Sequence, residues 1–155
     1  MLRAVPTSWL RWDYTLFDGE AAITTFEIDV AWETGTFSLG PKRYQVFFAR
    51  TRGGAFVLQS DDVILARAIQ LYAVELSFRV EAEHKHYIFE VSSVLQRKCV
   101  LREGDQSLGA VYPAHAFTWK AITDLPPQMA LPVRVFLTWL AIILLKRAAG
   151  DTTAS

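Results

Sequence analysis

The feature that most constrains the fold of this chain is an apolar segment close to its C-terminal end. Residues 135–145 comprise ten apolar residues and one threonine, and Lys146 and Arg147 follow directly. A helix that is apolar on every face must be surrounded, either by its own protein or by lipid. Because Pro132 suits a first helical turn and the two cations suit a last one, the sequence predicts a helix over about residues 132–149.

The segment that precedes this helix has the pattern of β-strands. Apolar and polar residues alternate from Phe26 to Trp32, every even-numbered residue from Tyr72 to Ala82 is apolar, and a shorter alternation covers 117–121. Alternation of period two indicates strands with one buried face. Turn-forming residues separate these segments without helical interruptions, so the sequence predicts an antiparallel meander over about residues 9–123.

Part of the meander repeats. A shift of 43 residues aligns residues 36–68 with 79–111 and matches identical residues at six of 33 positions, against about two expected from ordinary composition. The identical pairs are Lys42/Lys85, Tyr44/Tyr87, Val57/Val100, Leu58/Leu101, Asp62/Asp105 and Leu65/Leu108. We therefore expect a block of about four strands to occur at least twice. Cys99 aligns with Phe56, so we expect it to be a small buried apolar residue.

Two environments suit the predicted helix. A β-barrel of about ten to twelve strands is too wide to be filled by side chains alone, whereas a helix about 10 Å across fills it. The alternative is a membrane anchor, but the apolar stretch 132–145 contains Arg134 and is shorter than the roughly 17–25 residues of a spanning helix. We predict a single mainly β domain over 1–155: a closed antiparallel barrel around the helix, with a connector at 124–131 and a short tail at 150–155.

The composition argues against several classes of protein. Sixteen basic residues balance sixteen acidic ones, whereas a protein that binds nucleic acid usually has a basic excess. Cys99 is the single cysteine, so no internal disulfide can form, and the first residues lack the apolar core of a signal peptide. These features favour a cytoplasmic location.

The sequence shows no recognisable catalytic or cofactor motif. It lacks a phosphate-binding loop, a dinucleotide fingerprint, a nucleophile elbow and a zinc-protease helix, so we expect no cofactor and no enzyme activity. An enzyme with an unrecognised site remains an alternative. His84 and His86 lie two residues apart, but no further ligands follow at a zinc-binding spacing, which favours an exposed hairpin tip without metal.

Charge is unevenly distributed along the chain. Residues 34–60 carry four basic residues and no acidic one, while residues 1–33 carry six acidic and two basic residues. The basic residues of the first of these segments are Lys42, Arg43, Arg50 and Arg52. If they flank one hairpin, they would attract a phosphate or an anionic membrane surface. The alternative is that neighbouring strands pair their opposite charges across the sheet.

One stripe of the predicted helix is small or polar and includes a further candidate, Arg134. Thr138, Ala141 and Ala148 fall near the same side of the helix as this arginine. The stripe would line a cavity between helix and barrel wall, with Arg134 at its mouth to bind a carboxylate or phosphate. Alternatively, the small residues allow a strand to approach closely and Arg134 extends toward an acidic rim.

Several of these segments together resemble a known family. The meander in two related halves, the Asp124-Leu-Pro-Pro127 connector and the helix over 131–147 are similar to the tubby C-terminal-like superfamily. This group includes tubby domains, phospholipid scramblases and plant LURP-one-related proteins, and the Gly40-Pro-Lys-Arg-Tyr44 strand start is most similar to small bacterial members. The resemblance covers residues 9–149 and implies a closed barrel of about twelve strands threaded by the helix.

The function that the resemblance implies is less specific. Tubby domains bind phosphoinositides through basic residues on the barrel, and scramblases are linked to calcium and phospholipid. This chain has no dense lysine cluster and no acidic calcium loop beyond Glu103-Gly-Asp105. We predict a non-enzymatic module that binds phospholipid or phosphoinositide headgroups or a lipid-like ligand, in the cytoplasm or at a membrane periphery. A protein-interaction barrel and a membrane-anchored protein remain alternatives.

Overall fold

The computed structural model describes most of the chain. The described residues are 1–7, 13–29, 33–50, 54–71, 76–93, 95–116 and 118–153, with side chains as far as Ala148. The strands are β1 (Leu2–Pro6), β2 (Asp13–Asp18), β3 (Ala21–Glu27), β4 (Gly35–Leu39), β5 (Lys42–Ala49), β6 (Ala55–Ser60), β7 (Val63–Gln70), β8 (Ser77–Ala82), β9 (Lys85–Ser93), β10 (Lys98–Glu103), β11 (Gln106–Pro113) and β12 (Ala121–Asp124), and the helix is α1 (Leu131–Thr153).

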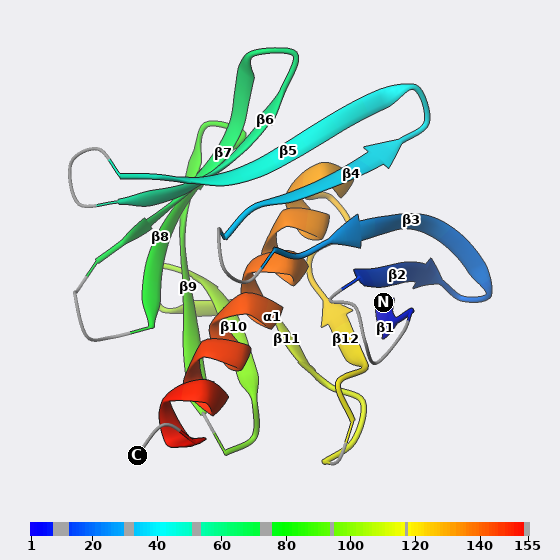
Figure 1. Cartoon of the computed structure of the whole chain (residues 1–155). Coiled ribbons are helices and arrows are strands. Elements are labelled where there is room, and N and C mark those ends of the chain that lie inside the picture. Colours follow the sequence, from blue (N-terminus) through cyan, green and yellow to red (C-terminus); the bar gives the residue numbers. More distant parts are fainter. Residues whose placement is uncertain are drawn as a thin grey trace.

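All the named strands belong to one antiparallel sheet that curves around α1 (Figure 1). Their order is β3-β2-β1-β12-β11-β10-β9-β8-β7-β6-β5-β4. The two end strands of this order, β3 and β4, approach each other, and the Thr24 hydroxyl of β3 donates a hydrogen bond to the Ser38 carbonyl of β4 (2.6 Å). The result is a nearly closed barrel of twelve strands, as the sequence predicts.

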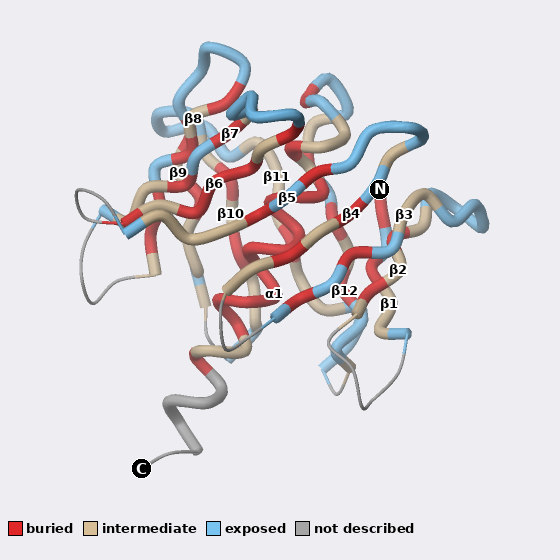
Figure 2. The backbone as a smooth tube through the Cα atoms, turned by 45° about the horizontal axis from the view of Figure 1, so that its top comes forward, coloured by how far each residue is buried: buried red, intermediate tan, exposed pale blue. Residues whose placement is uncertain are grey.

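The helix occupies the centre of this barrel. Every side chain from Val135 to Leu145 is at most 8% exposed, and Figure 2 shows this part of α1 as a buried segment inside the ring of strands. Burial of each large apolar side chain contributes about 1.5–3 kcal/mol, which makes the helix the main component of the core. In the described part of the chain, no helix is long and apolar enough to cross a membrane. The prediction of a central helix is confirmed.

The internal repeat is also present in the structure. Under the shift of 43 residues, β6 and β7 coincide with β10 and β11 in both their bounds. The register also shifts at equivalent points, between Leu58 and Gln59 in one repeat and between Leu101 and Arg102 in the other. A third register shift lies between Leu16 and Phe17 in the β2–β3 hairpin. A hairpin with a two-residue turn and a register shift therefore occurs three times in the sheet.

Three element boundaries differ from the prediction. The first strand begins at Leu2, not near residue 9, and the helix continues to Thr153 through part of the expected tail. The expected strand over 117–121 begins only at Ala121, and Phe117 lies outside the described residues. The reason is local hydrogen bonding: the Ala114 N–H donates to the Lys120 carbonyl, and the Lys120 N–H donates to the Thr118 hydroxyl. The first bond continues the β11–β12 pairing, and the second closes the turn that precedes β12.

The two ends of the barrel differ in their connections. Five hairpins, β2–β3, β4–β5, β6–β7, β8–β9 and β10–β11, turn through two residues each, and because strand directions alternate these turns share one end of the barrel. The helix begins at this end, which we call the helix-start mouth. The longer connections lie at the opposite end, the helix-end mouth, where Lys146 is located between aromatic side chains.

Candidate functional site

An open groove of about 870 Å³ lies at the helix-start mouth. Its walls come from β5, β7, the β8–β9 turn and the first residues of α1. The charged and imidazole side chains in its lining belong to Lys42, Arg67, Glu81, Glu83, His84, Lys85 and His86. The groove therefore brings together charged residues that are up to 44 positions apart in the sequence.

Two lysines reach this groove from equivalent positions of the repeat. Lys42 is the first residue of β5 and Lys85 the first residue of β9. Each lies two residues before a buried tyrosine, Tyr44 or Tyr87, and so lies on the inward-facing row of its strand. The apolar core does not extend to this end of the strands, so both lysines are exposed at the mouth.

The acidic side chains of the groove have partners. A Glu83 carboxylate oxygen accepts a hydrogen bond from the Ala130 N–H (2.8 Å), next to the start of α1. A carboxylate at this position compensates the positive end of the helix dipole. Glu81 lies 3.4 Å from Arg79 and 3.8 Å from the His86 imidazole. Their negative charge is thus partly neutralised within the protein.

The basic side chains of the groove, in contrast, lack such partners. Within the described residues, the side chains of Lys42, Arg67 and Lys85 form no hydrogen bond and no ion pair. Arg67 is exposed and stands opposite Glu81 in the β7–β8 register, but Glu81 engages Arg79 and His86 instead. Three cations therefore face the groove with their hydrogen-bond donors unsatisfied by protein.

The structure separates the four basic residues predicted as one site. Lys42 lines the groove, but Arg43 lines a smaller depression of about 370 Å³ along the β3–β4 seam. Arg50 follows the far end of β5, roughly 26 Å from Lys42 at 3.3 Å per strand residue. Arg52 lies outside the described residues. Lys42 and Arg50 flank a strand and not a turn, so a single anion cannot contact both.

Both the side chain and the carbonyl of Arg134 form hydrogen bonds within the protein. Its Nε donates a hydrogen bond to the Met129 carbonyl in the connector (2.9 Å). One turn later, the buried Thr138 hydroxyl donates a hydrogen bond to the Arg134 carbonyl. The Thr123 hydroxyl of β12 lies 2.8 Å from the Thr138 hydroxyl. Thr138 and Ala141 are both fully buried. The small side of the helix thus allows β12 to pack closely, and Arg134 contacts the connector, not an acidic rim.

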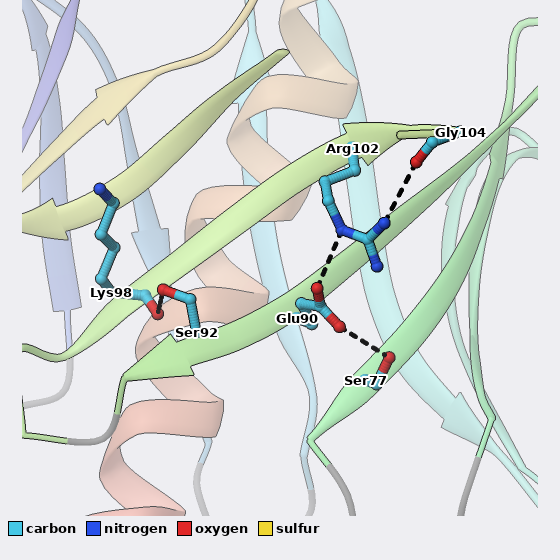
Figure 3. Close-up of polar contacts among 6 residues, drawn as sticks. All are labelled: Ser77, Glu90, Ser92, Lys98, Arg102 and Gly104. Carbon is cyan, nitrogen blue, oxygen red and sulfur yellow. Dashed lines mark hydrogen bonds and ion pairs between the residues drawn. The ribbon is translucent and has the colours of Figure 1, made fainter. Parts of the chain in front are cut away.

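A second polar cluster lies on the β8, β9 and β10 strands (Figure 3). Arg102 Nε donates to a Glu90 carboxylate oxygen (2.9 Å), and the Ser77 hydroxyl lies 3.5 Å from the other oxygen. Arg102 also donates to the Gly104 carbonyl (3.1 Å). Because its members satisfy one another across three strands, we interpret this cluster as structural.

Metal and thiol chemistry find no support in the described part of the chain. No group of three or more His, Cys, Asp or Glu side chains there is placed to hold a metal ion. Cys99 is fully buried, and its burial raises the pKa of the thiol to about 12. Such a cysteine packs as an apolar residue, as its alignment with the buried Phe56 predicts.

Sequence reasoning missed two residues of the groove, Arg67 and Lys85. Lys85 carries a usable signal, since it is identical to Lys42 in the repeat and equivalent residues reach the same end of the barrel. The sequence gives no comparable signal for Arg67, because its position at the groove depends on the β7–β8 register. No protein-family model, curated protein or solved structure matches this chain. The fold and the groove define the protein as a helix-centred β-barrel with an open groove, whose lining cations have no partner in the described part of the chain.

Proposed function

We propose that this protein is a non-enzymatic binding module whose groove at the helix-start mouth holds a phosphate-bearing anion such as a phospholipid headgroup. The observation that carries the proposal is the convergence of Lys42, Arg67 and Lys85, which have no hydrogen-bond or ion-pair partner among the described residues, on one groove of about 870 Å³. Charge-assisted hydrogen bonds from such groups to phosphate are short and strong.

The arrangement of the three cations suits a group with several phosphate oxygens. Lys42 and Lys85 each provide a compact charge with three donors, and Arg67 provides a planar guanidinium that can bind two oxygens together. The groove is open to solvent, so a headgroup can enter while the remainder of its molecule stays outside. Because Glu83 already occupies the helix N-terminus, the anion is held by side chains and not by the helix dipole.

The resemblance to the tubby-like superfamily supports the same proposal. A twelve-stranded barrel around a C-terminal helix agrees with the architecture that the resemblance implies. Membership of that superfamily and a cytoplasmic location remain proposals, and the binding experiment below tests the peripheral contact with a membrane.

A second candidate function is a protein-binding module. Val63 and Ile64 are 58% and 44% exposed at the start of β7, and Ile64 lines the groove. An exposed apolar pair beside a polar groove is typical of a protein-interaction surface. Asp61 and Asp62 form the turn directly before this pair, and their charges oppose insertion of the turn into an anionic bilayer.

The experiment that tests the proposed function is flotation with anionic and neutral liposomes. We expect the wild-type protein to float with anionic vesicles only, and less at high salt, because salt screens exposed charges. The variant Lys42→Glu/Lys85→Glu should lose at least ten-fold in binding. The control Arg50→Glu/Lys120→Glu makes the same change in net charge with exposed residues away from the groove and should stay within about two-fold of wild type.

A soluble ligand separates the remaining outcomes. Inositol hexakisphosphate in isothermal titration calorimetry probes the groove without a membrane. Binding that the groove variant loses and the control keeps supports the proposal, whether the anion is presented by vesicles or free in solution. Equal losses in the two variants, or absence of binding to both vesicles and the soluble phosphate, would contradict it and leave the protein-binding candidate.

A further inference from the structure

The helix-end mouth contains a second group of cations, stacked with aromatic rings. Lys146 Nζ lies 5.4 Å from the centroid of the Tyr14 ring and 5.2 Å from that of the Trp119 ring. The Arg97 guanidinium carbon lies 5.0 Å from the same Trp119 centroid. Two cations thus meet on one indole, which is 41% exposed and therefore accessible to a ligand.

Arg97 fastens the loop that carries this indole. Its Nη2 donates to the carbonyls of His115 and Ala116, at 3.3 and 2.8 Å. Arg97 itself has a left-handed backbone, with φ of 52°, a conformation that costs energy for a residue other than glycine. A guanidinium has five N–H donors, so donors remain beside the exposed face of Trp119.

The Tyr14 side chain at this mouth has a buried hydroxyl without a hydrogen-bond partner among the described residues. The residue is 1% exposed, and its hydroxyl makes no hydrogen bond within the described part of the chain. Burial raises the pKa of this hydroxyl above its usual value, so it remains a donor at all ordinary pH values. A buried donor without an acceptor is costly, and the ring of the same residue contacts Lys146.

The environment of Lys146 favours its neutral, nucleophilic form. Burial lowers the pKa of Lys146 from 10.5 to about 8, so much of the amine is unprotonated just above neutral pH. The neutral amine is the form that attacks carbonyl carbon. The two rings attract the ammonium form and place the Lys146 nitrogen beside the Trp119 indole.

We propose that Lys146 is a covalent-modification site for aldehydes that carry an anionic group, with Trp119 as the surface on which the aldehyde lies and Arg97 as the counter-ion of its anion. The site is separate from the groove at the helix-start mouth and does not depend on the function proposed for that groove. One nucleophile, one accessible ring and one guanidinium lie together at this mouth.

The reaction is an imine condensation. The neutral Lys146 nitrogen forms a bond to the carbonyl carbon, and the oxygen takes up a proton to give a carbinolamine. The carbon–oxygen bond then breaks, water leaves, and a carbon–nitrogen double bond remains. Starting from the neutral amine, one aldehyde is consumed and one water is released, which carries away the carbonyl oxygen and both protons of the amine, so no oxidant or reductant is required.

Labelling with pyridoxal 5′-phosphate as the probe tests the proposal. The full chain is treated with a limiting amount of the probe, trapped with borohydride and mapped by peptide mass spectrometry over pH 7–9. We expect Lys146 to be labelled at least five-fold faster than the average of the other four lysines, with a rate that rises through pH 8. The variant Lys146→Arg should remove this fast component, and Lys120→Arg, which changes an exposed lysine of the Trp119 loop, should not.

A second comparison tests the role of Arg97. Arg97→Gln should slow labelling by the phosphate-bearing probe several-fold more than labelling by the uncharged benzaldehyde, because benzaldehyde senses only the loss of the loop contacts; circular dichroism verifies that the variant is folded. Labelling distributed evenly over the five lysines, or a fast component that survives Lys146→Arg, would overturn the proposal. Equal slowing with both aldehydes would overturn the assigned role of Arg97.

Discussion

Replacement of Trp139 by phenylalanine probes the connection between the central helix and the seam of the barrel. The indole is 0% exposed, and its Nε1 donates a hydrogen bond to the Glu27 carbonyl (3.1 Å). Glu27 is the last residue of β3, which is one of the two end strands of the sheet. The same ring contacts Phe56 edge-to-face, with centroids 5.7 Å apart.

The expected loss of stability follows from two effects. The Glu27 carbonyl loses its buried donor, which costs about 1–3 kcal/mol, and the smaller ring leaves a void that costs about 1 kcal/mol more. Together the substitution should lower the free energy of unfolding by about 2–4 kcal/mol. For a chain of this length that corresponds to a decrease in Tm of roughly 5–15 °C.

Thermal and urea unfolding followed by circular dichroism measure this change. Trp119→Phe is the matched control, because it makes the same chemical change on an indole that is 41% exposed, and it should cost less than about 1 kcal/mol. If Trp139→Phe unfolds within 0.5 kcal/mol of the wild type, or if the two variants lose equally, the inference that the indole secures the seam is wrong.

Three further predictions concern the helix and its two ends. Glu83→Ala should lower the free energy of unfolding in urea by about 1 kcal/mol through loss of the contact to the Ala130 N–H; an unchanged midpoint would contradict this. A chain that ends at Ala130 lacks the central helix and should show no cooperative thermal transition by circular dichroism; a sharp transition would contradict the central role of α1. The unfolded chain keeps the Lys146 proton up to about pH 10, whereas the folded chain releases it near pH 8. The free energy of unfolding of the wild type, relative to that of Lys146→Met, should therefore rise by about 1–2 kcal/mol from pH 8 to 10. If the two proteins show parallel dependence of urea unfolding on pH, the pKa of Lys146 is not lowered.

The central helix and the repeat were predictable because each follows from the pattern of residues within a continuous segment of the sequence. Residues 135–145 are apolar in every direction, and a barrel with a hollow axis is one of few structures that surround such a helix. The repeat was visible because equivalent hairpins bury the same positions, such as Tyr44 and Tyr87. Neither prediction requires knowledge of strand order.

The grouping of charged residues was predictable only in part. Lys42 and Arg50 are close in sequence, but a strand runs between them and carries them to opposite mouths of the barrel. Arg67 and Lys85 join Lys42 because β7 and β9 bring their residues to the same mouth, which depends on register. Trp119 was expected in a strand, but hydrogen bonds within the 114–120 loop outweigh the alternating pattern there.

At each of the two proposed sites, a residue with a side chain stands where the other copy of the repeat has a glycine. Under the shift of 43 residues, Gly40 corresponds to Glu83 and Gly54 corresponds to Arg97, and all four residues have positive φ. Glycine adopts this conformation at little cost, whereas a residue with a side chain pays for it. In each case the substituted side chain makes a tertiary contact that glycine cannot: Glu83 contacts the helix start at the groove, and Arg97 holds the loop of Trp119.

This pattern makes the departures themselves testable. If the strain at Glu83 and Arg97 is retained for these contacts, then Glu83→Gly should recover part of the stability that Glu83→Ala loses, because glycine removes the strain along with the contact. Arg97→Gly should likewise be better tolerated in unfolding experiments than Arg97→Ala, while both release the Trp119 loop. A glycine variant that is less stable than its alanine counterpart at either position would show that backbone strain does not distinguish the two halves of the repeat.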